Sequence, residues 1–417
     1  MTNKNLMPLI STLLMGILFM ASTGCSKKVV ADADDLMKDV KPGTVSQIDA
    51  YNEADALKAM DFSLKLFQKN SSSENTLVSP ISVLTALGMT ANGAKANTLK
   101  EMEEVFGLET GTLNELLNLY IRKLPDEKKL KVSMANSIWF REGGRIEVVP
   151  GFLQTNADYY GAKIYRSAFD ESTLTAINQW VDMETDGMIK DILDEIPDEA
   201  VMYLINALSF DGEWENIYSE DEISPGEFTT EDGAKQTVDM MYSEEARYIK
   251  DDNATGFMKD YAGGDFAFVA LLPEEGTSVS EYVQSLTGEK LKSLMMNTED
   301  APVFTMIPKF KSEYSVEMSH ILKEMGMVDA FSEKLADLSG LGTSPEGNLY
   351  INRVIHKTAI EVNEKGTKAG AATVVEVATE SAVMETYAVK LDRPFVYLIV
   401  DTTSYLPLFI GTTMSVE

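Results

Sequence analysis

Cysteine and histidine are nearly missing from this chain. A single cysteine, Cys25, excludes an internal disulfide framework. The two histidines, His320 and His356, leave few groups for general acid–base chemistry. We expect His320 on a helix surface and His356 in a structural hydrogen bond. The motifs GxSxG, HExxH and CxxC, the Walker loop and GxGxxG are also absent. The sequence therefore argues against an enzyme, and we expect no metal site and no cofactor.

Basic residues are scarce as well. The chain of 417 residues has 36 Lys and Arg against 66 Asp and Glu, a formal net charge of −30. Binding of nucleic acid requires clustered Lys and Arg that neutralise phosphates, so this composition argues against it. The short basic cluster of Lys128, Lys129 and Lys131 is better explained as a solvated face. The acidic stretch "DILDEIPDE" is explained in the same way.

The apolar stretch from Leu6 to Ala21 is short for a membrane-spanning helix. It is followed by small residues that lead to Cys25, an arrangement typical of a bacterial lipoprotein signal. Ser22 departs from that motif, which prefers Leu at this position. The sequence predicts lipidation at Cys25, and a plain secretion signal with an incidental cysteine is the alternative.

The N-terminal prediction divides the chain into three parts. Residues 1–25 are the signal peptide, residues 26–48 form a polar, mobile tether, and residues 49–417 form one domain. The protein would lie at the bacterial cell envelope, anchored by the lipid alone and exposed at the surface. Without the lipid it would be secreted.

From Asp49 onward, apolar patterns predict a mixture of helices and buried strands. "SPISVLTALGMTANGAK" predicts a helix that opens at Pro80, with Ser79 as its cap. Helices are also predicted for "DAYNEADALKAMDFSLKLFQKN" and "SEYSVEMSHILKEMGM". Strands are predicted for "LKVSMANSIWF", "VMYLINALSF" and "FAFVALLPEEG", and two more for "RPFVYLIVDTTSYLPLFIGTTMSV". Strands without strict alternation are covered on both faces, so we expect an α+β fold with a large, well-covered sheet.

One stretch near the C-terminus, "EKGTKAGAATVVEVATES" (364–381), has an unusual pattern. Its odd-numbered positions from 367 to 379 are uncharged and small or β-branched, whereas the even-numbered positions include Lys368, Glu376 and Glu380. Side chains of a strand alternate between two faces, so this pattern gives one face for a core and one for water. Gly and Ala are nevertheless poor strand formers. The stretch is suited to fit inside a sheet that already exists.

Several sequence blocks in order resemble the serpin family. "NTLVSPISVLTALGMTANGAKANTLKEM" is similar to the second and third helices of serpins, and "ANSIWF" to the third strand of their main sheet. "INALSFDGEWE", "FAFVALLPEEG", "IPKFKSEYSV", "INRVIHKTAIEVNEKGTKAGAAT" and "DRPFVYLIV…LFIGTT" match later blocks. The resemblance implies the serpin fold, with a large central sheet covered by helices, a second sheet region and an exposed reactive-centre loop at about residues 364–391.

The resemblance also implies a function. Serpins are suicide substrates: a serine protease cuts the loop and is trapped as a covalent acyl-enzyme when the loop inserts into the central sheet, a release of stored strain. We therefore expect a monomeric inhibitor of serine proteases, and of papain-like cysteine proteases, rather than an enzyme. A heparin-type cofactor is disfavoured by the acidity. The alternative is a non-inhibitory serpin that acts as a surface binding protein.

Residue roles follow from the same resemblance. The hinge, from which insertion starts, would be Glu364, Gly366, Thr367, Ala369, Ala371, Ala372 and Thr373. The shutter, a polar cluster beneath the strands that must part, would be Ser79, Ser82, Asn206 and His356. The breach, where insertion begins, would be Trp214, Lys309 and Glu364, with an ion pair between Lys309 and Glu364. Counting seventeen residues from Glu364 places the reactive bond between Glu380 and Ser381, with cleavage after Ala378, Thr379 or Met384 as alternatives.

Overall fold

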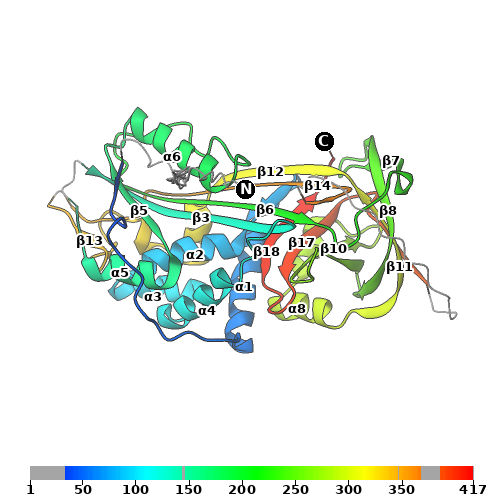
Figure 1. Ribbon diagram of the computed structural model, residues 1–417, viewed down its shortest axis with the longest axis horizontal. Helices are drawn as coiled ribbons and strands as arrows, with labels where there is room; N and C mark the ends of the chain where they lie inside the picture. Colours follow the sequence, from blue (N-terminus) through cyan, green and yellow to red (C-terminus); the bar gives the residue numbers. More distant parts are fainter. Residues whose placement is uncertain (1–32, 143–145, 346, 368–385, 417) are drawn as a thin grey trace, which may run out of the picture.

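The computed structural model describes residues 33–142, 146–345, 347–367 and 386–416. Two large β-sheets, a separate two-stranded pair and helices on both faces of the main sheet make up this part of the chain (Figure 1). The main sheet has the strand order β1-β5-β3-β6-β15-β14-β12. Its strands are β1 (Ala33–Asp35), β3 (Leu130–Arg141), β5 (Lys163–Ser167), β6 (Met202–Glu213), β12 (Phe310–Glu317), β14 (Arg353–Asn363) and β15 (Gly366–Thr367).

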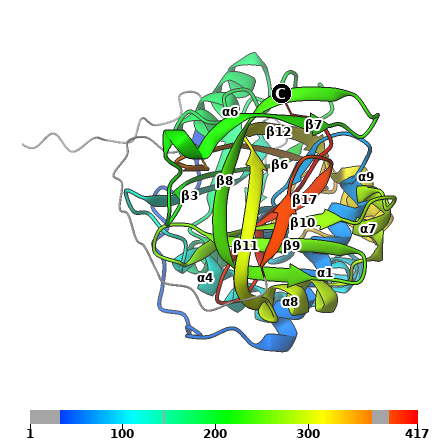
Figure 2. The ribbon, with the colours of Figure 1, turned by 90° about the vertical axis from the view of Figure 1, so that its right-hand side faces the viewer.

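The second sheet has the order β16-β11-β8-β9-β10-β17-β18-β2, with β7 paired to β8. It occupies one end of the molecule, and Figure 2 looks onto that end. The strands are β2 (Thr76–Val78), β7 (Ile223–Thr229), β8 (Lys235–Lys250), β9 (Ala254–Asp260), β10 (Phe266–Pro273), β11 (Glu299–Pro308), β16 (Tyr387–Lys390), β17 (Phe395–Asp401) and β18 (Pro407–Thr413). A separate pair joins β4 (Glu147–Val148) to β13 (Gly342–Thr343).

Helices cover both faces of the main sheet (Figure 1). The helix α6 (Glu171–Glu184) lies on one face and α2 (Pro80–Ala91) on the other. Every residue of α2 is buried, which its apolar sequence permits. The remaining helices are α1 (Glu53–Asn70), α3 (Ala96–Phe106), α4 (Thr110–Arg122), α5 (Pro150–Tyr160), α7 (Val279–Ser285), α8 (Gly288–Met296) and α9 (Ser319–Met325), with single 3-10 turns η2 (Glu220–Glu222) and η3 (Asp329–Phe331).

The core explains why the central strands lack strict alternation. On β6, Leu204 and Leu208 pack into the large core shared with α2 and the second sheet. Tyr203 and Ile205 pack into a smaller core under α6. Both faces of the strand are therefore buried, as the sequence predicted. No helix within the described residues is long and apolar enough to span a membrane.

The predicted tether is wrong for the part that the structure describes. Residues 33–35 form β1, which pairs with β5, a strand that would otherwise be the edge strand of the main sheet. The amide of Leu36 donates to the carbonyl of Ile164 at 2.9 Å, and Met37 is buried in the large core. The edge strand offers unpaired backbone groups that a neighbouring segment satisfies even when that segment is mostly polar.

One further prediction about local structure is wrong, and another holds only in part. The helix predicted over residues 312–327 begins only at Ser319, because Phe310–Glu317 form β12 along β14. Ser79 is the N-cap residue of α2, as predicted, but its hydroxyl makes no capping hydrogen bond and has no partner among the described residues. Its backbone amide instead donates to His356 Nε2 at 3.0 Å. The start of α2 is thus fixed by Pro80 and by a contact with the main sheet.

Candidate functional site: hinge, breach and shutter

The chain makes a tight hairpin at the end of β14. Residues 364 and 365 form the turn, and Gly366 and Thr367 return as β15 between β6 and β14. Gly366 is the register partner of Asn363 and Glu213, and Thr367 is the partner of Val362 and Gly212. The first two residues of the predicted inserting strand are therefore already part of the main sheet.

Only glycine fits at position 366. Its φ is 155°, a conformation that L side chains rarely adopt. A Cβ atom there would lie 1.9 Å from the carbonyl oxygen of Gly212 on β6. Thr367 is fully buried, and its hydroxyl lies 2.7 Å from the hydroxyl of Tyr261. Among the predicted core-facing positions from 367 to 379, the structure describes Thr367. Its side chain faces the core.

The breach residues meet at the hairpin turn. Trp214 donates from its backbone amide to the carbonyl of Lys365 at 2.8 Å, and from Nε1 to the carbonyl of Asn363 at 2.9 Å. Lys309 Nζ lies 3.0 Å from Glu364 Oε2. Partial burial acts to raise the pKa of Glu364, but the hydrogen bond from Lys309, a backbone hydrogen bond and the charges of Lys309 and Lys365 together hold the pKa below its ordinary value.

The shutter residues meet at the seam, which we define as the parallel pairing of Tyr203–Ser209 on β6 with Arg353–Ala359 on β14. Asn206 and His356 are register partners across the seam, and His356 Nδ1 contacts Asn206 Oδ1. Asn206 Nδ2 donates to Ser82 Oγ at 2.5 Å, and the amide of Ser79 donates to His356 Nε2. The first turns of α2 therefore bind both strands of the seam.

Burial sets the protonation state of His356. The side chain is fully buried, and burial lowers the pKa to about 3. Because Nε2 accepts a hydrogen bond from Ser79, the proton of the neutral ring lies on Nδ1, which donates to Asn206. This is the structural hydrogen-bonding role that the sequence predicted. His320 lies exposed on α9, with Nε2 3.5 Å from Glu324.

Several predicted site residues lie outside the described residues. They include Cys25 with the signal peptide, the hinge residues Ala369, Ala371, Ala372 and Thr373, and the reactive-bond candidates Ala378, Thr379, Glu380, Ser381 and Met384. The structure leaves those predictions as they stand.

Sequence reasoning missed two groups of residues at the site. Asn136 on β3 contacts Asn206 Nδ2 through its Oδ1 and belongs to the shutter. It lies in the "ANSIWF" block, where its polarity inside a buried strand was the available signal. Tyr218 and Tyr261 contact the turn and β15, and no local pattern singles them out, because their partners are more than 100 residues away in the sequence.

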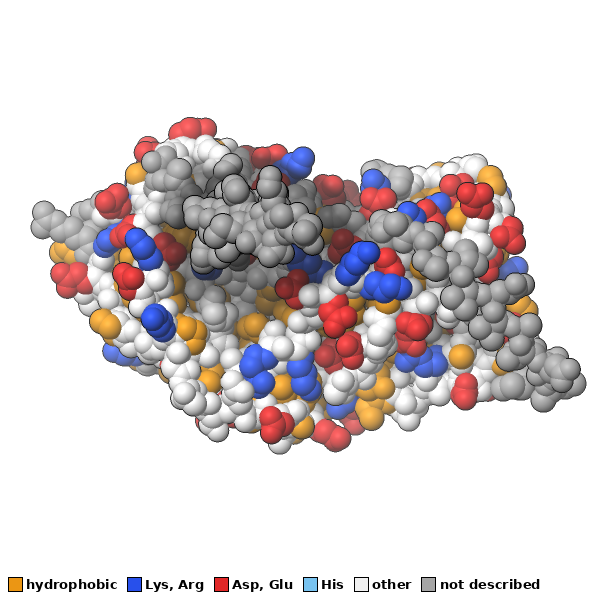
Figure 3. All heavy atoms as spheres, viewed as in Figure 1, with side chains coloured by type: hydrophobic (Ala, Val, Ile, Leu, Met, Phe, Trp, Pro, Cys, Tyr) orange, Lys and Arg blue, Asp and Glu red, His pale blue; other side chains and the backbone are white. Residues whose placement is uncertain are grey.

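The site combines a short strand with a parallel pairing of two long ones. Within the described residues, no group of three or more His, Cys, Asp or Glu is placed to hold a metal ion. Acidic side chains lie among the basic ones over the described surface in Figure 3. The geometry that stands out is a two-residue strand at the end of a seam.

Comparisons with known proteins agree with this architecture. The family model Serpin (serine protease inhibitor) matches residues 57–416. The chain is 27% identical to antithrombin-III of Bos taurus over 403 residues, which cover 93% of this chain and 86% of that protein. It is 30% identical to leukocyte elastase inhibitor A of Mus musculus over 375 residues, 85% of this chain and 97% of that protein. The crystal structure of the thermophilic serpin Tengpin in its native state matches with a TM-score of 0.89 and 45% identity, over 92% of this chain and all of that one. The chain belongs to the serpin family.

Proposed function

We propose that this protein is a suicide-substrate inhibitor of serine proteases, and of papain-like cysteine proteases, that traps its target by inserting the cleaved loop into the main sheet. The observation that carries the proposal is β15. It lies between β6 and β14 at the open end of the seam, so the residues after Thr367 can continue along the same path.

Insertion along the seam is favourable in backbone hydrogen bonding. The seam is one parallel ladder of seven residue pairs. A strand that continues β15 would be antiparallel to both neighbours and would replace this ladder with two antiparallel ones. Antiparallel pairing is slightly more stable per residue, and each added hydrogen bond stabilises by about 0.5–1.5 kcal/mol. The uncharged face of residues 367–379 would enter the core, which stabilises the inserted state further.

Trapping of the protease follows from the free energy gained when the strand inserts. When the protease attacks the loop, the peptide nitrogen leaves as a new amino terminus, and the loop carbonyl stays joined to the enzyme as an ester of serine or a thioester of cysteine. Insertion then drags the protease along the sheet and distorts its active site. Loss of one oxyanion-hole donor alone slows acyl chemistry by about 10²- to 10³-fold, so the ester survives. Serpin loop insertion is itself a standard example of strain released by proteolysis.

A panel of serine and cysteine proteases tests the proposal. The purified protein is mixed with each protease, separated on denaturing gels, and the released C-terminal fragment is weighed by mass spectrometry. We expect an adduct that survives denaturant and a fragment that starts at Ser381. A fragment with another start would move the reactive bond to Ala378, Thr379 or Met384. Cleavage by every protease without an adduct would overturn the inhibitor proposal in favour of a non-inhibitory binding protein.

We also propose that the protein is anchored at the cell envelope through a lipid on Cys25. The support is the sequence pattern before this cysteine. Metabolic labelling with a fatty-acid analogue should mark the wild type and leave Cys25→Ser unlabelled. Equal labelling of both proteins, or of neither, would contradict the anchor.

A further inference from the structure

A lysine is buried next to the breach. Lys259 on β9 has a side chain that is only 2% exposed, and its Nζ lies 2.7 Å from Oε1 of Glu245, which is 11% exposed. Removing a charge from water is costly unless a partner compensates for it. A charged pair at this depth therefore calls for a reason beyond packing, since apolar residues of the same volume are often as stable there.

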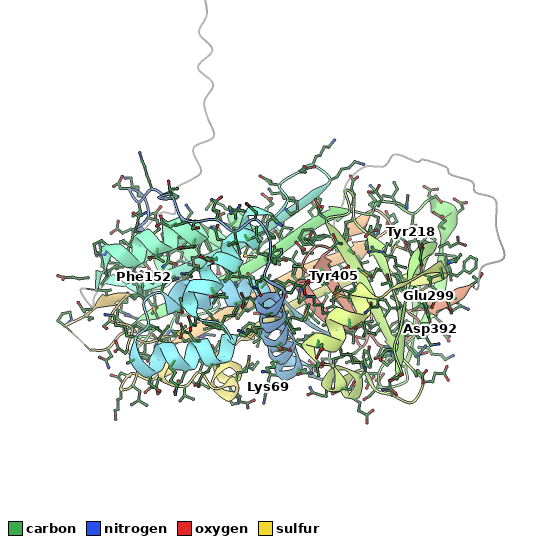
Figure 4. All side chains as sticks on the ribbon, turned by 90° about the horizontal axis from the view of Figure 1, so that it is seen from below. Lys69, Phe152, Tyr218, Glu299, Asp392 and Tyr405 are labelled. Atoms are coloured by element: carbon green, nitrogen blue, oxygen red, sulfur yellow. The ribbon has the colours of Figure 1, made fainter. Side chains whose placement is uncertain are left out.

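Two aromatic rings complete the surroundings of this cation. Lys259 Nζ lies 4.6 Å from the ring centroid of Tyr218 and 5.5 Å from that of Trp214. Both distances are in the range of cation–π attraction. Trp214 is stacked on Tyr261 with centroids 4.5 Å apart. Tyr218, labelled in Figure 4, lies toward the end of the molecule built by the second sheet. The cation thus fixes the positions of two rings that come from the segment after β6.

Trp214 and Tyr218 also bind the hairpin turn between β14 and β15. Trp214 donates to the carbonyls of Asn363 and Lys365, and the backbone amide of Tyr218 donates to the carbonyl of Glu364 at 2.9 Å. Trp214 and Tyr218 therefore bind three successive carbonyls, from the last residue of β14 through the turn. Any shift of these two residues moves the turn from which β15 starts.

A hydrogen-bonded chain fixes Glu245 in turn. Ser243 Oγ donates to Glu245 Oε1 at 2.7 Å, and the hydroxyls of Ser243 and Tyr218 lie 3.1 Å apart. Thr305 on β11 lies 2.8 Å from Ser243 Oγ. Glu245 and Tyr218 are thus linked through Ser243 as well as through Lys259, which makes the group rigid.

We propose that Lys259 and Glu245 are positioning residues for loop insertion. By fixing Trp214 and Tyr218 they hold the β14–β15 turn in the hairpin geometry, so that insertion continues an existing strand instead of starting a new one. The inference deepens the proposed inhibitor function and rests on it for its effect on proteases. Its structural part, the retention of β15 in the sheet, stands without any protease.

The main variant replaces both charges, Lys259→Met with Glu245→Gln, so that neither is left buried alone. Lys259→Arg keeps the cation and serves as the conservative variant. The matched control is Lys290→Met with Asp251→Asn, because that pair also joins a lysine to a buried carboxylate, 2.8 Å apart, on α8 and beside β9. Tyr218→Leu removes one ring and leaves the ion pair intact. It replaces the double variant if that protein does not fold.

The first readout is amide hydrogen exchange of the peptide containing Gly366 and Thr367 in the uncut full chain. We expect exchange at least about fivefold faster in the double variant and in Tyr218→Leu. Wild-type rates are expected in Lys259→Arg and in the Lys290/Asp251 control. A lowered melting temperature with unchanged exchange at β15 would show a purely structural ion pair and would overturn the proposal.

The second readout is the number of inhibitor molecules consumed per protease trapped, measured with a protease that the wild type inhibits. Insertion competes with hydrolysis of the acyl ester, so slower insertion should raise this number at least about twofold in the double variant. An unchanged number together with faster exchange would remove the link to inhibition. If the wild type traps no protease at all, the inhibitor function fails, and the exchange result alone decides whether Lys259 positions the hairpin.

Discussion

Individual side chains hold the seam closed from the side of α2. Ser82 binds Asn206 on β6, and the amide of Ser79 binds His356 on β14. A strand entering between β6 and β14 separates Asn206 from His356 and must break their contact. The shutter is therefore a small polar cluster in an apolar surrounding. Each hydrogen bond lost there lowers the stability by about 1–3 kcal/mol if the groups stay unpaired.

The protonation of His356 gives the first prediction. Its pKa is about 3 in the folded protein against an ordinary 6.5, so the unfolded state binds more protons between these values. The contribution of the neutral His356 to the free energy of unfolding is fully present above about pH 6.5, and it decreases as the pH falls toward 3. Between pH 7 and 5.5 the loss should be about 1–1.5 kcal/mol in the free energy of unfolding.

Thermal melts between pH 7.5 and 5 check this. His356→Gln should be less stable at pH 7, because one hydrogen bond is lost, and its melting temperature should fall less with acid than that of the wild type. His320→Gln, at an exposed position on α9, should follow the wild type. Equal acid sensitivity of His356→Gln and the wild type would contradict the assignment.

The ion pair at the breach gives the second prediction. Glu364→Lys places two like charges 3.0 Å apart in the present geometry and loosens the hairpin turn. When β15 leaves, β6 and β14 present unpaired backbone groups to which a strand of another molecule can add. Native gels after mild heating should show a ladder of polymers for Glu364→Lys. The charge-reversed pair Lys309→Glu with Glu364→Lys should stay largely monomeric. If Glu364→Lys alone also stays monomeric, the ion pair does not hold the hairpin turn in place.

The proposed insertion would start from the short strand β15, whose place between β6 and β14 requires glycine at position 366. Gly366→Ala brings a Cβ within 1.9 Å of the Gly212 carbonyl oxygen and adds strain of about 1–3 kcal/mol. We expect β15 to leave the sheet and the fraction of protease trapped to fall. Gly233→Ala is the control, since Gly233 also has positive φ, 83°, but no atom near its Cβ position. Equal trapping by both variants would show that β15 is dispensable.

The alternation of the loop gives a second test of an element. Thr373 belongs to the predicted core face and Ala372 to the predicted water face. Thr373→Arg would carry a charge into the core on insertion, a cost of several kcal/mol, whereas Ala372→Arg would leave its charge in water. Denaturing gels with a target protease should show cleavage without adduct for Thr373→Arg and an adduct for Ala372→Arg. The reverse result would mean that the register is shifted by one residue.

The sequence predicted elements whose signal is local. The apolar spacing of α1, the proline at the start of α2 and the continuous apolar run of β10 each occupy one segment, and each was found. The sequence predicts helix for part of β12. The pairing with β14, which is distant in the sequence, makes this segment a strand. Asn136 and the buried Lys259 became recognisable only when partners distant in the sequence were placed beside them.

At the scale of the whole molecule, the proposed function requires that the main sheet can accept one further strand between β6 and β14. Under this proposal, the uncut fold would be separated from a more stable inserted fold by the free energy needed to open the seam, and it would be kinetically trapped. Cleavage between Thr367 and β16 would remove the covalent connection to β16 and would allow the cut segment to insert as a strand. About a dozen inserted residues with two ladders at 0.5–1.5 kcal/mol per bond should raise the melting temperature by at least about 15 °C.

Differential scanning calorimetry of uncut and loop-cut protein tests this final prediction. A protease that cuts within residues 368–385 without being trapped prepares the cut sample. The cut wild type should melt well above the uncut protein, and cut Thr373→Arg should gain little, because its strand cannot enter the core. A cut wild type that melts at or below the uncut protein would mean that the native sheet is already the most stable one. In that case the seam would be an ordinary parallel pairing, and β15 only the end of a hairpin.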